Sequence, residues 1–226
     1  MVVVPDTVEI EIGPQRLKAL LGVPAGAEGL VIFAHGSGSG RLSPRNNRVA
    51  AALREAGLAT LLLDLLTPDE ERDRASVFDI PLLASRLSFA ADWSVAMAEM
   101  AHLPIGYFGA STGAGAALVV AAEPRTPVRA IVSRGGRPDL AGAALPRVTA
   151  PTLLIVGGLD TQVIELNRMA YNRLEATKEL VIVPGAGHLF EEPGTLDEVQ
   201  HHAIRWFRRY LAGDLAGDHL AGEEDA

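Results

Sequence analysis

The sequence predicts an α/β fold in which a mostly parallel, twisted sheet of about eight strands carries helices on both faces. Three observations lead to this prediction. Short apolar runs alternate with helical patterns along the chain. Six of these runs are apolar at both odd and even positions, which is typical of strands buried on both faces. No repeat or linker divides the 226 residues. We therefore expect one domain over residues 1–212 and an acidic, flexible tail over residues 213–226.

The first two strands are expected as an antiparallel pair. Val8–Ile12 and Arg16–Val23 lie on either side of Gly13 and Pro14, a dipeptide typical of a turn. The six buried strands are expected at residues 29–35, 58–66, 104–110, 128–134, 151–158 and 178–185.

Start and stop signals place helices between these strands. Ser43 is expected as the N-cap before Pro44, and Gly57 ends the same helix. The segment Thr195–Glu198 (TLDE) matches a capping box ahead of the last helix. The polar stretch Thr67–Asp79 is expected to be an irregular loop at the rim of a site, with no separate lid domain. The remaining helices are expected at residues 82–100, 112–122 and 161–176.

Composition narrows the classes of function and partner. The net charge of -8 argues against nucleic acid or an anionic membrane as a partner. The absence of cysteine excludes disulfides, thiolate catalysis and cysteine-ligated metals. The apolar run near the N-terminus stops after four residues and no basic stretch precedes it. We therefore expect no signal peptide and no membrane-spanning segment, and a cytoplasmic protein that needs no metal or cofactor.

One serine lies in a motif that suggests nucleophilic catalysis. The segment Gly109–Gly113 (GASTG) matches G-x-S-x-G, the nucleophile elbow, between an apolar strand and a helix of small residues. The two glycines allow the strand and the helix to approach closely, so that the Ser111 hydroxyl stands exposed at the turn. The alternative is a helix start at which small residues merely permit tight packing, and the motif alone does not decide between the two.

A serine nucleophile needs a base, and the base needs an orienting acid. Asp160 follows one buried strand and His188 follows the next, so both fall at the strand ends where Ser111 also lies. Asp160 could instead only cap the helix that begins at Thr161, and Asp139 is the alternative acid. We expect four other histidines at the surface: His102, His201, His202 and His219.

A second glycine-rich loop, His35–Gly40 (HGSGSG), follows another buried strand. We expect the backbone N–H groups of Ser37 and Thr112 to form an oxyanion hole, in which each donor is worth roughly 3–4 kcal/mol of transition-state stabilisation. A phosphate-binding loop is the alternative, with Asp64 as the ribose-binding acid, although the G-x-G-x-x-G spacing is missing. His35 is expected to anchor the loop.

These elements together resemble the serine α/β-hydrolase superfamily, most closely its dienelactone-hydrolase-like branch. The motifs that carry the resemblance are HGSGSG (35–40), GASTG (109–113), GGLD (157–160) and GAGH (185–188), which occur in family order and cover nearly the whole chain. The resemblance implies the α/β-hydrolase fold, with Ser111 as nucleophile, His188 as base and Asp160 as orienting acid. Dienelactone hydrolases proper use a cysteine nucleophile, so the serine here looks more like that of carboxylesterases.

The sequence therefore predicts a cofactor-independent serine hydrolase acting on small carboxylic esters. Arg41, Arg134 and Arg137 lie on loops near the same sheet edge and could attract an anionic group of the substrate, although ordinary surface salt bridging is the favoured interpretation of these arginines. The same residues could support acyl transfer or perhydrolysis, in which the acceptor is not water. A non-catalytic protein that binds a small ligand on the hydrolase scaffold is a further alternative.

Overall fold

The computed structural model describes residues 7–124 and 128–213. Its centre is an eight-stranded sheet in the order β1-β2-β4-β3-β5-β6-β7-β8. The pairs β1–β2 and β2–β4 are antiparallel, and every other neighbouring pair is parallel. The predicted fold class is thus confirmed. The strands are β1 Val8–Ile12, β2 Leu17–Gly22, β3 Leu30–Ala34, β4 Ala59–Leu63, β5 Ile105–Ala110, β6 Val128–Arg134, β7 Thr152–Gly157 and β8 Lys178–Val183.

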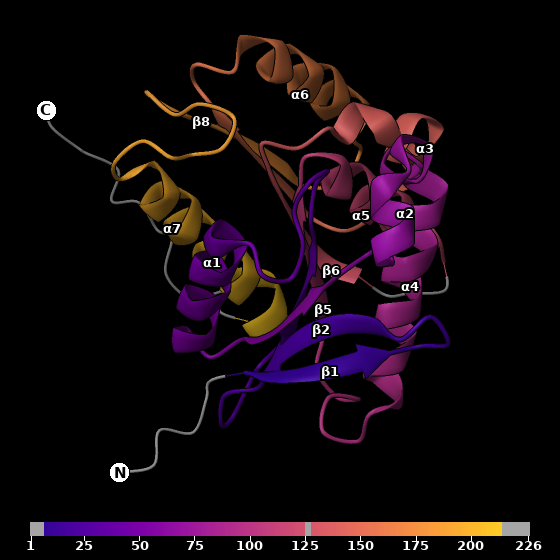
Figure 1. The fold of residues 1–226 in the computed structure, drawn as a ribbon. Helices are drawn as coiled ribbons and strands as arrows, with labels where there is room; N and C mark the ends of the chain where they lie inside the picture. The colour runs from indigo at the N-terminus through magenta and orange to yellow at the C-terminus, as the bar shows by residue number, and fades with distance from the viewer. Residues whose placement is uncertain (1–6, 125–127, 214–226) are drawn as a thin grey trace, which may run out of the picture.

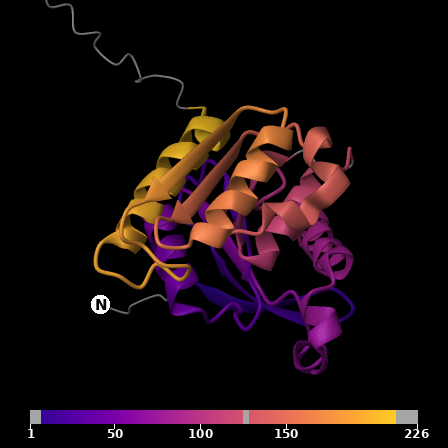
Figure 2. The same ribbon diagram turned by 90° about the horizontal axis from the view of Figure 1, so that it is seen from above.

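Helices cover both faces of the sheet (Figures 1 and 2). Helices α1 and α7 pack on one face, and α4, α5 and α6 lie on the other. The helices are α1 Pro44–Glu55, α2 Pro68–Arg72, α3 Arg74–Val77, α4 Ile80–Ala96, α5 Thr112–Ala121, α6 Thr161–Arg173 and α7 Thr195–Phe207. A kinked 3₁₀ segment spans Pro138–Arg147, and a π-helical turn spans Arg208–Ala212. None of the helices in the described ranges is long and apolar enough to cross a membrane.

The two faces of the central strands contribute to separate cores. On β3, Leu30, Ile32 and Ala34 pack with α4 and α5, whereas Val31 and Phe33 pack with α1 and α7. Every residue of β3, β4, β5 and β7 is buried, which explains why these runs carry apolar side chains at both parities. The parallel strands therefore direct their carboxyl ends, and the loops that follow them, to one edge of the sheet.

The stretch Thr67–Asp79 was expected to be irregular, and that expectation is wrong. Thr67 and Glu70 form a capping box that starts α2, and Asp73 then accepts two backbone N–H groups at the start of α3. Asp79 caps α4 through the N–H of Leu82, so α4 begins two residues before the expected start. Polar residues that suggested a loop here serve as helix caps.

The N-cap of α1 was predicted correctly, but the capping box of the last helix was not. Ser43 Oγ accepts the N–H of Asn46, 3.4 Å away. At α7 the N-cap is Gly194, in the left-handed region at φ 81, and no side chain caps the helix. Thr195 Oγ1 instead donates to the carbonyl of Glu192, so it is not available to the helix. The predicted tail and His219 lie outside the described residues from 214 onward.

Candidate active site

Ser111 sits at a strained turn between β5 and α5. Its backbone has φ 49 and ψ -123, a conformation that L-residues rarely adopt and that is typical of a nucleophile elbow. A Cβ on Gly109 would lie 2.5 Å from Ala114 Cα, and one on Gly113 would lie 2.1 Å from the Ala34 carbonyl oxygen. Both motif glycines are therefore required by the close approach of β3, β5 and α5. The tight packing of small residues and the strained turn at Ser111 are both present, so the two interpretations of the motif do not exclude each other.

Asp160 and His188 meet at the same edge. Asp160 follows β7 and His188 follows β8, and Asp160 Oδ2 lies 2.6 Å from His188 Nδ1. The Asp160 side chain makes no capping hydrogen bond to α6, so it does not serve only as a helix cap. The alternative acid, Asp139, instead accepts two hydrogen bonds of 2.8 Å each from Arg137. A carboxylate only accepts hydrogen bonds, so Nδ1 is the donor in this contact, and in the neutral ring Nε2 is then the acceptor.

The end of β6 connects the serine and histidine loops. Arg134 pairs with Ala110, the residue before Ser111, and the Arg137 N–H donates to the Ser111 carbonyl at 2.9 Å. At Gly135, where φ is 52, a Cβ would lie 3.0 Å from the His188 carbonyl oxygen and 3.6 Å from His188 Nδ1. The two loops thus rest on the same strand end.

The glycine-rich loop after β3 packs directly against the elbow. A Cβ on Gly36 would lie 2.7 Å from Ser111 Cβ and 3.5 Å from Ser111 Oγ. Thr112 is the first residue of α5, so its N–H has no acceptor within the helix. Within the described ranges, the Ser37 N–H does not donate to any acceptor either. This arrangement is compatible with two N–H donors on one side of Ser111, and the oxyanion hole stays a prediction.

His35 anchors that loop, as expected. Its Nε2 accepts the N–H of Leu65 at 2.9 Å, so the ring proton is on Nδ1, which donates to the Gly36 carbonyl at 3.0 Å. Burial lowers the pKa of His35, which keeps the ring neutral and preserves both hydrogen bonds. The ring thereby connects the loop after β3 to the end of β4.

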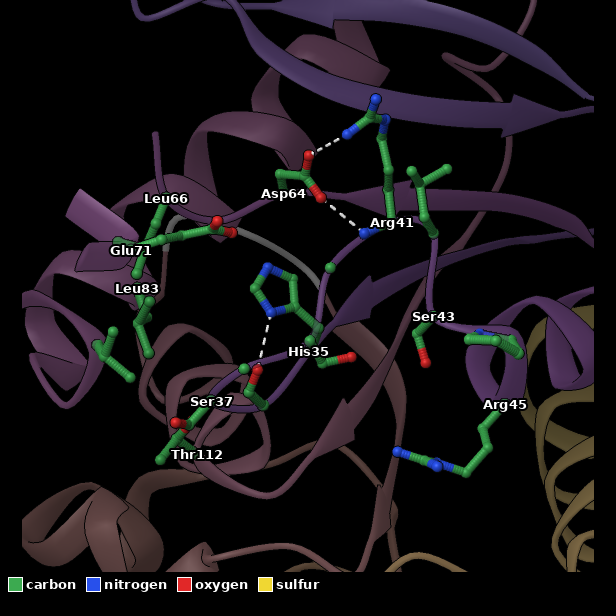
Figure 3. A pocket seen from close by; sticks show the side chains of 17 residues that line it. His35, Ser37, Arg41, Ser43, Arg45, Asp64, Leu66, Glu71, Leu83 and Thr112 are labelled. Atoms are coloured by element: carbon green, nitrogen blue, oxygen red, sulfur yellow. Dashed lines mark hydrogen bonds and ion pairs between the residues drawn. The ribbon is translucent and has the colours of Figure 1, made fainter. Parts of the chain in front are cut away.

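A pocket of about 480 Å³ opens beside the elbow (Figure 3). Its walls are the loop at residues 35–41, the first turn of α1, the end of β4 and the α2–α3 segment. Ser37 and Thr112 both line it, whereas Ser111, Asp160 and His188 do not. The pocket therefore adjoins the two residues that carry the candidate N–H donors. The lining is mixed, with the leucines 42, 66 and 83 beside the hydroxyl groups of Ser37, Ser39 and Ser43.

A model of the dienelactone hydrolase family matches residues 17–211. The chain belongs to this family. Among solved structures, dienelactone hydrolase from Anabaena variabilis ATCC 29413 is 58% identical, covers 91% of this chain and 97% of its own, and superimposes with a TM-score of 0.87. Est1E from Butyrivibrio proteoclasticus, at 16% identity and a TM-score of 0.74, covers 88% of this chain and 96% of its own and shows the fold alone.

Two curated relatives of this dienelactone hydrolase family member come from Mycobacterium tuberculosis, strains CDC 1551 and H37Rv. Each is named "Putative phosphoribosyl transferase" and is 58% identical over 208 residues, which is 92% of this chain and 47% of the relative. The chain thus spans about half the length of the curated relatives it matches. The name of these relatives does not refer to the dienelactone hydrolase family, which is the family that this chain matches. The chain thus has the family and the fold of the dienelactone hydrolases, with Ser111 at the turn between β5 and α5.

The structure places the two predicted substrate-binding arginines differently. Arg41 lines the pocket, but its guanidinium donates to Asp64 at 2.5 Å (Figure 3). It also donates to Glu9 at 3.1 Å. Arg134 is buried and is not among the pocket residues. Substrate binding by either residue stays a prediction. Asp64, considered above as a ribose-binding acid, is held by Arg41 through both carboxylate oxygens.

Arg45 is a pocket residue that was not predicted from the sequence. This residue lies in the first turn of α1, lines the pocket, and donates to Glu191 Oε1 at 2.7 Å. Its partner is three residues beyond His188, so the ion pair connects the pocket wall to the histidine loop. In the sequence, Arg45 is one charged residue at a helix start, and nothing local indicates a partner 146 positions away.

Proposed function

We propose that the protein is a serine hydrolase that cleaves small carboxylic esters through an acyl-enzyme. The observation that carries the proposal is the 2.6 Å contact between Asp160 and His188, at the same sheet edge as a serine held at φ 49. In this reading Ser111 Oγ attacks the ester carbonyl while His188 Nε2 accepts the hydroxyl proton. Asp160 keeps the ring in the required tautomer and stabilises the imidazolium that forms.

The negative charge that develops on the carbonyl oxygen would be stabilised by the backbone N–H groups of Ser37 and Thr112. The intermediate then collapses: the bond to the alcohol oxygen breaks, and His188 gives its proton to that oxygen. In the second half, His188 removes a proton from water, whose oxygen attacks the acyl carbon. The acid leaves, and Ser111 recovers its proton from His188.

The pocket supports a small substrate. It adjoins the two candidate donors, so one half of the ester would lie in it while the other half lies on the His188 side. A volume of about 480 Å³ lies in the lower part of the range for small-molecule sites, roughly 300–1,000 Å³. Its mixture of leucine side chains and serine hydroxyls favours a short, partly polar group over a long acyl chain.

The test is labelling and kinetics with the full chain. A fluorophosphonate probe should label Ser111, and p-nitrophenyl acetate hydrolysis should fall by at least about 10⁴-fold in Ser111→Ala and in His188→Ala. Asp139→Asn is the matched carboxylate control, because Asp139 is held by Arg137, and it should retain activity. Absence of labelling in folded protein, or activity retained in Ser111→Ala, would contradict the proposal.

A further inference from the structure

Arg134 carries a buried guanidinium at the end of β6. Its side chain lies at the end of β6 and is only 6% exposed, and no carboxylate in the described part of the chain forms an ion pair with it. Nη2 donates to Asn46 Oδ1 at 3.0 Å, and Nε is buried with no hydrogen-bond partner among the described residues. The guanidinium lies 5.9 Å from the centre of the Phe190 ring. Burial, and secondarily the charge of Arg45, lowers the pKa of Arg134 to about 10, so the group remains charged at neutral pH.

A buried guanidinium of this kind contributes little to the stability of a fold. A buried charge without an opposite charge opposes folding, and an apolar side chain of similar volume often serves stability better. One amide oxygen and one aromatic face compensate only part of the desolvation of the guanidinium. The position of Arg134 therefore requires an explanation other than stability.

Arg134 lies between the histidine loop and the start of α1. Phe190 is two residues beyond His188, and Asn46 belongs to the first turn of α1. The same two segments are joined a second time by the Arg45–Glu191 ion pair at 2.7 Å. The histidine loop and the start of α1 are thus connected twice, by the buried Arg134 guanidinium and by the more exposed Arg45–Glu191 ion pair.

The histidine loop needs such connections because its backbone is strained. Phe190 has φ 55, a conformation that is unfavourable for a bulky residue and that persists only when its surroundings enforce it. Its ring is 2% exposed, packed in the core beneath α1 and α7. On the other side of His188, the Gly187 N–H donates to Glu192 Oε2 at 3.0 Å. His188 itself is half-exposed, so its direction depends on these flanking residues.

We propose that Arg134 is a positioning residue for His188. Its guanidinium binds the Phe190 ring and the Asn46 side chain at once, and so holds the histidine loop against α1 with the imidazole directed toward Ser111. This inference rests on the proposed function, since it assigns to Arg134 the alignment of the proposed base. It requires the guanidinium and not merely the volume of the side chain.

The decisive variant is Arg134→Met, which keeps much of the volume and removes the charge and the hydrogen bond. We expect kcat for p-nitrophenyl acetate to fall by about 10- to 100-fold, the scale of a small misalignment, with KM within about twofold of wild type. The melting temperature should equal or exceed that of wild type, because a buried charge is removed. Arg134→Lys keeps the charge and should recover part of kcat. Arg129→Met, on the exposed opposite end of β6, is the matched control and should leave kcat unchanged.

Titration with the fluorophosphonate gives the fraction of active protein, so that kcat refers to folded sites alone. Should Arg134→Met not fold, Arg134→Lys decides: a reduced kcat at unchanged KM supports the inference. Wild-type kcat in folded Arg134→Met overturns it, as does a loss that only follows a lower melting temperature or active fraction. A wild-type protein that is neither labelled nor active overturns the proposed function as well, whereas an active wild type with an unaffected variant overturns this inference alone.

Discussion

Replacing Gly36 by alanine tests the contact between the glycine-rich loop and the elbow. The new methyl carbon would lie 2.7 Å from Ser111 Cβ and 3.0 Å from the Ala110 carbonyl oxygen. Carbon atoms pack at about 3.5–4.0 Å, so the loop and the elbow would have to separate by about 1 Å. Both are backbone segments held by buried strands, and no flexible side chain can absorb the change.

The size of the effect follows from that separation. A displacement of about 1 Å at a catalytic group can lower the rate about 10²-fold, equivalent to about 2.7 kcal/mol of transition-state stabilisation. If the movement also withdraws the Ser37 N–H from the oxyanion, the loss could reach about 10³-fold. Overpacking should reduce stability by about 1–3 kcal/mol, or roughly 2–12 °C in melting temperature for a chain of this size. Gly36→Ala should therefore remain folded at 25 °C and be nearly inactive.

The assay is kcat/KM for p-nitrophenyl acetate at 25 °C together with thermal unfolding by circular dichroism. Gly26→Ala is the control: Gly26 has φ 71 and open space around it, so alanine there should reduce stability without touching the site. Comparable melting temperatures with activity lost only in Gly36→Ala would support the reasoning. A Gly36→Ala protein with kcat/KM within about threefold of wild type would refute it, because the elbow and loop would then tolerate separation.

Two further predictions concern Asp160 and His35. Asp160→Asn should lower kcat by about 10⁴-fold with little change in fold, since the amide cannot hold His188 in the same tautomer; single-turnover kinetics would check this, and near-wild-type kcat would contradict it. Burial lowers the pKa of His35, so the folded state binds a proton there less readily than the unfolded state does. The free energy of unfolding should therefore be highest above pH about 6.5. It should fall by up to about 1.4 kcal/mol per pH unit as the pH drops toward the lowered native pKa. Urea unfolding measured from pH 7.5 to 5 should show this slope, and the slope should be smaller in His35→Gln. Burial also lowers the pKa of His202, so His202→Gln serves to measure the part of the slope that comes from His202. An unchanged slope in His35→Gln would contradict the assignment.

The sheet could be predicted because each buried strand is a local signal. A strand covered on both faces must be apolar at both parities, and β3, β4, β5 and β7 are buried throughout. The turn at Ser111 could also be predicted from local sequence, because contacts between adjacent elements require glycines at a fixed spacing around the serine. Asp160 and His188 followed from the rule that parallel strands end at one edge.

Features that depend on distant partners were not accessible in the same way. Thr195 matched a capping box by spacing, but the Glu192 carbonyl competes for its hydroxyl. Salt bridging was expected for Arg41, but the sequence does not identify Asp64 and Glu9 as its partners, because the sheet brings them to it. Arg45 gave no local signal at all, because its partner lies on the histidine loop. In each case the side chain has several possible partners, and the tertiary fold selects one.

The strands that carry the two sides of the site differ in how well they are held. Ser111 follows β5, a central strand buried at every residue. His188 follows β8, which is only partly buried and, among the described strands, pairs with β7 alone at the edge of the sheet. Edge strands open more readily than central ones because fewer buried contacts hold them. A loop on β8 therefore needs additional support to aim a side chain as well as β5 aims Ser111. In the proposed arrangement, the contacts of Phe190 and Glu191 with Arg134 and Arg45 add that support from β6 and α1, beside the packing of the Phe190 ring in the core.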